Sequence, residues 1–203
     1  MTMRKYVGAV VCTFIFAALA VQVSAGEEKK GQEASDKMME EWAKMSAPGE
    51  HHAHLNAVVG KWSYVSKWRM SPEAPWDESK GTSEHEWALG KRFVVSKCSG
   101  EMKDGMRFEG MGMWGYDNTT KKYTSTWADN MCTAIMKTTG TCDESGKTFT
   151  MSGEYVDPMT GAKKTAKSVT KIINNDKYVF EMFDKDEAGK EFKSLEVAYT
   201  RIK

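Results

Sequence analysis

The stretch HHAHLNAVVGKWSYVSKWRM, residues 51–70, contains the transition that decides the fold. Its first half is typical of a short helix, because residues such as Leu55 and Val58 recur at helical spacing. From residue 61 onward large apolar residues alternate with mostly polar ones, which predicts a half-buried strand. Gly60 lies between the two patterns and permits a sharp turn. The indole of Trp62 is then expected to plug the closed end of a barrel.

The same alternation recurs in four later segments: HEWAL (85–89), FTMSGEY (149–155), YVFEM (178–182) and LEVAYTR (195–201). Between the strands lie segments that begin with Asp and reach Gly or Thr a few residues later, as in DNTTKKY, DESGKTF, DPMTGAKK and DEAGKEF. Such segments are typical of hairpin turns. We therefore predict an all-β fold, an up-and-down antiparallel barrel of about ten strands, since closure removes exposed strand edges.

Four parts of the chain follow from these patterns. We expect a signal peptide over 1–25, a flexible leader over 26–34, one or two short helices over 35–59 and the barrel over 60–203. Arg4 and Lys5 precede an apolar run too short to span a bilayer, and small residues at Val23 and Ala25 suit cleavage before Gly26. The protein is therefore expected to be exported, periplasmic or extracellular, with no membrane span after cleavage.

Arg201, in the last predicted strand, has the same inward parity as Tyr199. Its guanidinium over the Trp62 ring would contribute a cation–π contact of about 1–2 kcal/mol and tie the last strand to the first. A Gly-x-Trp motif at the start of the first strand, together with a basic residue in the last strand, resembles the lipocalin-like, or calycin, group of ligand-binding barrels.

A second resemblance covers residues 42–202. The segments PGEHHAHLNAVVGKW, GYDNTTKKY, TWADNM, GEYVDPMTG and GKEFK…YTR resemble, in order, the bacterial Domain of Unknown Function 1579 family. The matching positions of its Pro-Gly-x-x-His segment are Pro48, Gly49 and His52. The resemblance implies a calycin-like barrel, often with an export signal, and no established activity.

Charge and cysteine content limit the possible partners. Without residues 1–25 the chain has 27 basic and 28 acidic residues, a balance that argues against a nucleic-acid surface. Cys98, Cys132 and Cys142 then remain. A disulfide between Cys98 and Cys132 is the least implausible pair, and three free thiols are an equal alternative.

The leading functional hypothesis is non-covalent binding of a small apolar or amphipathic molecule in the barrel lumen. Residues 71–81, with two prolines and Trp76, are expected to form a loop over one mouth, a candidate lid. The candidate lumen residues are His85, Trp87, Trp114, Trp127, Met151, Tyr155, Phe180 and Tyr199.

Three alternatives stay open. His51 and His54 are weak metal candidates, because no Cys or acidic cluster accompanies them, and we expect neither a metal site nor a cofactor. An enzyme would use His85 with lumen acids, although Glu84 and Glu86 point to the other face of the strand. The third alternative is an envelope structural or interaction protein whose barrel is filled by its own aromatic rings.

Overall fold

The computed structural model describes residues 25–102, 105–157 and 160–203. These fall into two compact units, one ending at Trp42 and one running from Ala43 to Lys203, and each is described by itself. All but Ala25 of the predicted signal peptide lies outside the described residues. No helix in the described ranges is long and apolar enough to cross a membrane.

The first element is helix α1, Ala25–Ser46. It contains residues 26–34, for which the sequence suggested a flexible leader, so the helix begins well before Ser35. The reason is local: charged and polar helix formers outnumber the two glycines, Gly26 and Gly31, and Gln32 Nε2 donates to Asp36 Oδ1 across one turn at 2.7 Å.

Two short helices follow a break at residues 47–49, where Pro48 and Gly49 disfavour a continuous helix. They are α2, Glu50–Ala53, and the 3₁₀-helix η1, His54–Val58. The backbone N–H of Gly49 donates to His52 Nδ1 at 3.1 Å, so the His52 side chain fixes the start of α2. Leu55 and Val58 of η1 are fully buried, which gives this short segment its stability.

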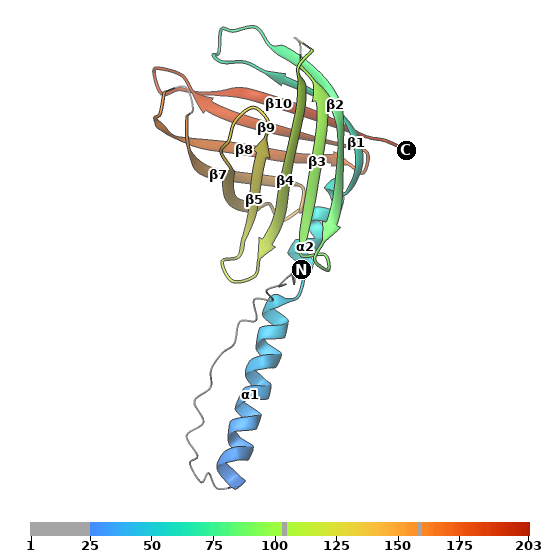
Figure 1. The fold of residues 1–203 in the computed structure, drawn as a ribbon, viewed down its shortest axis with the longest axis vertical. Helices are drawn as coiled ribbons and strands as arrows, with labels where there is room; N and C mark the ends of the chain where they lie inside the picture. The colour runs from blue at the N-terminus through green and yellow to red at the C-terminus, as the bar shows by residue number, and fades with distance from the viewer. Residues whose placement is uncertain (1–24, 103–104, 158–159) are drawn as a thin grey trace, which may run out of the picture. The chain divides into compact units, whose positions relative to one another are not determined.

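Ten antiparallel strands form a closed barrel in which every strand pairs with its chain neighbours and β1 also pairs with β10 (Figure 1). They are β1 Gly60–Trp68, β2 Asp77–Ala88, β3 Phe93–Glu101, β4 Arg107–Asp117, β5 Lys122–Asp129, β6 Met136–Cys142, β7 Thr148–Val156, β8 Lys163–Asn174, β9 Lys177–Lys185 and β10 Glu191–Arg201. The predicted fold class is confirmed. Closure satisfies the edges that β1 and β10 would otherwise expose.

The barrel core lies at the end covered by η1. Side chains alternate inward and outward, and the inward ones at this end pack with η1 into one cluster. Its fully buried large members are Leu55, Trp62, Phe149 and Met151. The Trp62 indole N–H donates to the Val58 carbonyl at 2.8 Å, so the ring that plugs the barrel also holds the helix.

Arg201 joins three parts of the chain at the closed end. Its guanidinium carbon lies 4.1 Å from the centre of the Trp62 ring, and Trp62 is its register partner across β1 and β10, so the contact that the sequence predicts is present. The guanidinium also donates to the carbonyls of Val59 at 2.7 Å, Ala57 at 3.3 Å and Asn175 at 2.7 Å.

Gly60 is the point where the helix segment enters the barrel. Its φ of +127° is open to glycine but strained for other residues, and a Cβ there would collide with the Arg201 guanidinium. The position thus requires glycine for two independent reasons.

The predicted loop over 71–81 is shorter than expected. Strand β2 begins at Asp77, so only residues 69–76 connect β1 to β2. Arg69 fastens this connection: its Nη1 donates to the Pro72 carbonyl at 2.7 Å, and its guanidinium lies over the Trp76 ring, 4.5 Å from the centre. Prolines at 72 and 75 misled the prediction, because the alternation of β2 starts directly after Trp76.

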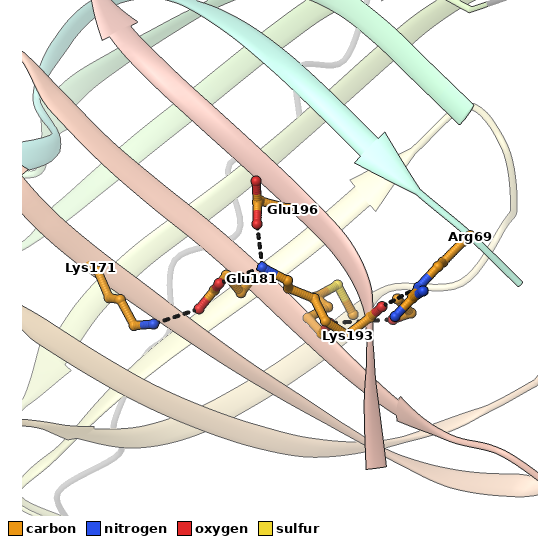
Figure 2. A network of polar contacts seen from close by, with 7 residues as sticks. Arg69, Lys171, Glu181, Lys193 and Glu196 are labelled. Carbon is orange, nitrogen blue, oxygen red and sulfur yellow. Dashed lines mark hydrogen bonds and ion pairs between the residues drawn. The ribbon is translucent and has the colours of Figure 1, made fainter. Parts of the chain in front are cut away.

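A network of charged side chains crosses the outer face of β8, β9 and β10 (Figure 2). Glu181 accepts from Lys171 at 2.8 Å and from Lys193 at 2.9 Å, and Lys193 also pairs with Glu196. Burial raises the pKa of Glu181, but the two lysine hydrogen bonds outweigh it and the pKa lies below its ordinary value. Glu181 therefore stays ionised although it is only 9% exposed, and it links three strands.

We predict that Arg201→Ala lowers the free energy of unfolding by about 3 kcal/mol, because several charge-assisted hydrogen bonds and the cation–π contact are lost together. Urea denaturation followed by circular dichroism measures the change. The matched control is Arg107→Ala on the outer surface, whose side chain is 76% exposed and forms a surface ion pair with Glu109, and it should cost at most about 1 kcal/mol. Equal effects of the two substitutions would contradict the anchoring role of Arg201.

Candidate functional site: the barrel lumen

The lumen between the closed-end core and the opposite mouth contains a cavity of about 510 Å³. Every strand of the barrel contributes to its wall, and Val58 of η1 reaches it from the closed end. Its aromatic lining consists of Tyr64, Trp68, Phe108, Trp114, Trp127, Tyr178, Phe180 and Tyr199. Methionines complete much of the apolar wall, including Met102 and Met131 next to the strand ends at the mouth. The volume is typical of pockets for small organic molecules.

Six of the eight predicted lumen residues line this cavity: His85, Trp114, Trp127, Met151, Phe180 and Tyr199. The other two do not line it, although both share the inward parity of their strands. Trp87 packs against the closed-end core and donates its indole N–H to Asn56 Oδ1 at 3.0 Å. Tyr155 lies near the mouth, where Asp184, Lys164 and Asp157 are close enough to influence its phenol. Parity identifies the inner face, but not the height of a residue within the lumen.

None of residues 71–76 contributes to the cavity lining. The connection is pinned by Arg69 rather than lying across the lumen, and the Arg69 guanidinium also contacts Phe192, 5.7 Å from the ring centre. The prediction of a lid over 71–81 is therefore not supported, and Ser79 from the same range lines the wall as part of β2.

Hydroxyl groups form the main polar component of the wall, and the sequence argument missed them. They belong to Ser66, Ser79, Ser96, Ser125, Thr126, Thr138, Ser168 and Thr170. All but Thr126 occupy the inward parity of their strands, but β6 and β8, which supply Thr138, Ser168 and Thr170, contain no aromatic residue that would have drawn attention to them. Small hydroxyl side chains at inward positions leave open a space that larger residues would fill. The alternation of residues along each strand already indicates which positions point inward.

The Tyr178 hydroxyl is buried and has no hydrogen-bond partner among the described residues. The Tyr178 ring stacks on Tyr199 with centres 4.2 Å apart and planes 11° apart. Burial, with a further contribution from the Tyr199 phenol, raises the pKa of Tyr178 well above its ordinary value, so the group stays a neutral donor. An unsatisfied buried hydroxyl costs free energy, which the packing around the tyrosine pair must offset.

His85 lies beside this tyrosine pair, with ring centres 6.2 Å from Tyr178 and 6.1 Å from Tyr199. Its Nε2 is 2.5 Å from the Ser83 hydroxyl, which is itself buried and is not part of the cavity lining. Burial lowers the pKa of His85 from 6.5 to about 4, so the imidazole is neutral at pH 7. No hydrogen bond joins His85 to a carboxylate within the part of the chain that the structure describes. The arrangement is that of a neutral polar wall residue.

Cys98, Cys132 and Cys142, the cysteines within the described residues, are free thiols. Cys98 lines the cavity, and burial raises its pKa to about 11. It is therefore protonated at neutral pH and a poor nucleophile. The pairing of Cys98 with Cys132 is absent, because Cys98 faces the lumen within β3 whereas Cys132 is exposed beyond the end of β5.

Trp127 lies against the barrel wall over two glycines of β4. A Cβ on Gly110 would collide with the six-membered ring of the indole, and a Cβ on Gly112 would come within 3.0 Å of Trp127 Cε3. The indole N–H donates to Asp129 Oδ2 at 2.8 Å. Asp129 is the one formally charged residue among the described residues that line the cavity.

The histidines of the opening stretch hold the helical segment on the closed end of the barrel. His51 stacks on Tyr116 with centres 4.4 Å apart. His54 Nδ1 lies 2.8 Å from the Tyr123 hydroxyl, which donates to the His51 carbonyl at 3.0 Å. Across the described ranges, no three His, Cys, Asp or Glu side chains are grouped as a metal site requires.

We predict that the free energy of unfolding decreases as the pH is lowered, because His85 becomes protonated. The folded pKa is depressed, so the contribution is fully present above pH 6.5 and declines as pH falls toward about 4, by up to about 3 kcal/mol. His85→Gln removes the ionisable ring, and its free energy of unfolding should therefore approach that of the wild type, or exceed it, as the pH decreases. Urea denaturation between pH 7.5 and pH 4 measures this difference.

The control for this experiment is His51→Gln, which retains His85 and should keep the wild-type dependence on pH. If the difference in the free energy of unfolding between wild type and His85→Gln stays constant with pH, His85 is not buried in its neutral form.

Two solved structures share this fold. The crystal structure of Rv2717c from M. tuberculosis is 13% identical, has a TM-score of 0.58, and covers 77% of this chain and 100% of its own. The S-type phycobiliprotein lyase CPES from Guillardia theta is 12% identical, has a TM-score of 0.53, and covers 77% of this chain and 99% of its own. No curated protein matches the chain.

The family comparison extends over nearly the whole barrel. The family model described as protein of unknown function (DUF1579) matches residues 47–201, from the break before α2 to Arg201 at the end of β10. This range contains Gly60, Trp62 and the lumen. The chain therefore belongs to the DUF1579 family.

Proposed function

We propose that this protein binds a small apolar or amphipathic molecule non-covalently in the lumen of its barrel. The observation that carries the proposal is the cavity of about 510 Å³, whose wall is mostly aromatic rings and methionines with dispersed hydroxyl groups. The serine and threonine hydroxyls of the wall supply donors and acceptors for a polar atom of the ligand.

The wall has the chemistry that such binding needs. A ligand that buries about 300 Å² of apolar surface gains roughly 7 kcal/mol by leaving water, before the entropic cost of association. Ionisable groups near the deep end, His85 and Tyr178, are neutral at pH 7, so an apolar ligand does not desolvate a charge there. The similar barrel of a phycobiliprotein lyase supports the architecture alone, because it is only 12% identical.

The alternatives are less well supported. A barrel filled by its own aromatic rings is hard to reconcile with the volume left between them. An enzyme using His85 and lumen acids would need a carboxylate within reach of the imidazole. His85 is instead hydrogen-bonded to Ser83. The one acid among the described residues of the wall is Asp129, at the end of β5. Binding without chemistry is the function that this wall favours.

We also propose that the chain is exported and loses residues 1–25. The support is in the sequence, where Arg4 and Lys5 precede an apolar run that ends in small residues. We expect the protein recovered from the exported fraction of its own cells to have an intact mass that starts at Gly26. A mass that includes the first 25 residues in that fraction would overturn cleavage.

The lumen is tested with the neutral fluorescent probe N-phenyl-1-naphthylamine. We predict that Ser168→Phe, which places a ring in the cavity, weakens probe binding by at least about tenfold, equivalent to about 1.4 kcal/mol. Fluorescence titration gives the dissociation constants. The matched control is Ser152→Phe on the adjacent strand β7, where the side chain is exposed on the outer face, and binding should stay within about twofold of wild type.

Native mass spectrometry of the protein from its own compartment complements the titration, because a retained organic mass would identify the chemical class of the ligand. If wild type fails to bind the neutral probe, or if Ser152→Phe and Ser168→Phe weaken it equally, the lumen is not the binding site and the proposal is wrong.

A further inference from the structure

We infer that the ligand carries a positively charged group, held by the Asp129 carboxylate and the adjoining Trp127 indole. This inference rests on the proposed function, since it concerns the same lumen, and it adds the charge of the ligand and the place where that charge is bound.

The first argument is the charge of the wall. Among the described residues that line the cavity, Asp129 is the single formal charge, and lysine and arginine are absent from that set. The histidine, tyrosine and cysteine side chains of the wall do not supply a positive charge at pH 7, because His85 is neutral. A buried anion would therefore meet a carboxylate and no counter-charge, which is costly, whereas a cation would be paired.

The second argument is the orientation of Trp127. The six-membered ring extends along β4 from Gly112 to Gly110, occupying the space that two Cβ atoms would otherwise take. The ring thus lies against the backbone of β4, and the Trp127 side chain also lines the cavity. Indole is the best cation–π acceptor among protein side chains, and the contact is stronger where bulk water is excluded.

The third argument is the contact between the two groups. Asp129 Oδ2 accepts the indole N–H of Trp127 at 2.8 Å, and Oδ1 accepts the backbone N–H of Met131 at 3.0 Å. Each oxygen keeps a further lone-pair direction for a ligand. Donation of the indole proton to a carboxylate also increases the electron density of the ring, so the two sites for a cation reinforce each other.

The site lies where an amphipathic ligand would need it. Asp129 ends β5, and the opposite end of β5 begins beside Tyr123 in the closed-end core, so the carboxylate is on the mouth side of the lumen. A chain or ring system directed toward Phe180 and Met151 would remain in the apolar interior while its cationic group stays at Asp129. A quaternary or protonated amine with an apolar tail fits this division.

The test compares three probes of equal chain length, dodecyltrimethylammonium, dodecanol and dodecanoate, as displacers of N-phenyl-1-naphthylamine from the full barrel. We expect the ammonium compound to displace the probe at a concentration at least about tenfold lower than dodecanoate. Asp129→Asn keeps an acceptor for its neighbours but removes the charge. In this variant the displacing concentration of dodecanoate should exceed that of the ammonium compound by about threefold or less. The matched control, Glu154→Gln on the outer face of β7, removes one negative charge outside the lumen and should keep the wild-type ratio.

The outcomes separate the two proposals. If dodecanol displaces the probe but the ammonium and carboxylate compounds are equally effective, or dodecanoate is better, the inference about charge is wrong while lumen binding stands. If none of the three probes competes, lumen binding itself is wrong. Trp127→Leu provides a second variant in case Asp129→Asn unfolds: it removes the ring and should also reduce the preference for the ammonium compound, and an unchanged preference would overturn the role of the indole.

Discussion

The pairing of Arg201 with Trp62 connects the last strand of the barrel to the first, and the cavity depends on that closure. The guanidinium covers one face of the indole and donates to the carbonyls at the end of η1, while the indole N–H holds Val58. One side-chain pair therefore reinforces the β1–β10 seam that closes the sheet and fixes the helical segment at the closed end. This arrangement depends on glycine at position 60, because the side chain of any larger residue would collide with the guanidinium.

Side chains fill one end of the barrel, and the cavity lies between this core and the opposite mouth. The closed-end core packs the lower part of the barrel with large side chains, whereas the wall above it alternates aromatic rings with serines and threonines. Small residues keep the middle of the lumen open, and two glycines of β4 let the large Trp127 ring approach the wall closely. The fold thus separates stability, which resides at the plugged end, from the volume available to a ligand.

Charge is distributed in the same way. The outer surface of β8, β9 and β10 has ion pairs around Glu181, whose oxygens are satisfied by two lysines (Figure 2). The interior is nearly free of formal charge, and its ionisable groups near the deep end are held neutral by burial. Asp129 is the exception among the described residues of the wall, and its contact with an indole is the basis of the proposal that the ligand carries a positive charge.

The alternation of residues determined much of this protein without reference to the tertiary structure. Strand periodicity with Asp- and Gly-containing turns predicted the ten-stranded barrel, and the parity of Trp62 and Arg201 predicted their contact, because side-chain direction in a strand is a local property. Parity also indicated the inward side of the strands, and six of the eight candidate residues line the cavity. Trp87 and Tyr155 point inward as well but lie outside the lining, since the height of a residue along the barrel axis depends on register and strand tilt, which are set by distant partners.

Three features were decided by tertiary structure alone. The histidines at 51–54 could be a metal cluster or a structural segment by sequence, and only the packing of Tyr116 and Tyr123 against them shows which contacts they make. The extent of the open lumen follows from how ten strands place their small residues opposite one another. The site at Asp129 and Trp127 needs β4 to supply two glycines beneath a ring from β5. Sequence fixes the direction of a side chain within its own strand, but the space that remains between strands is a property of their joint packing.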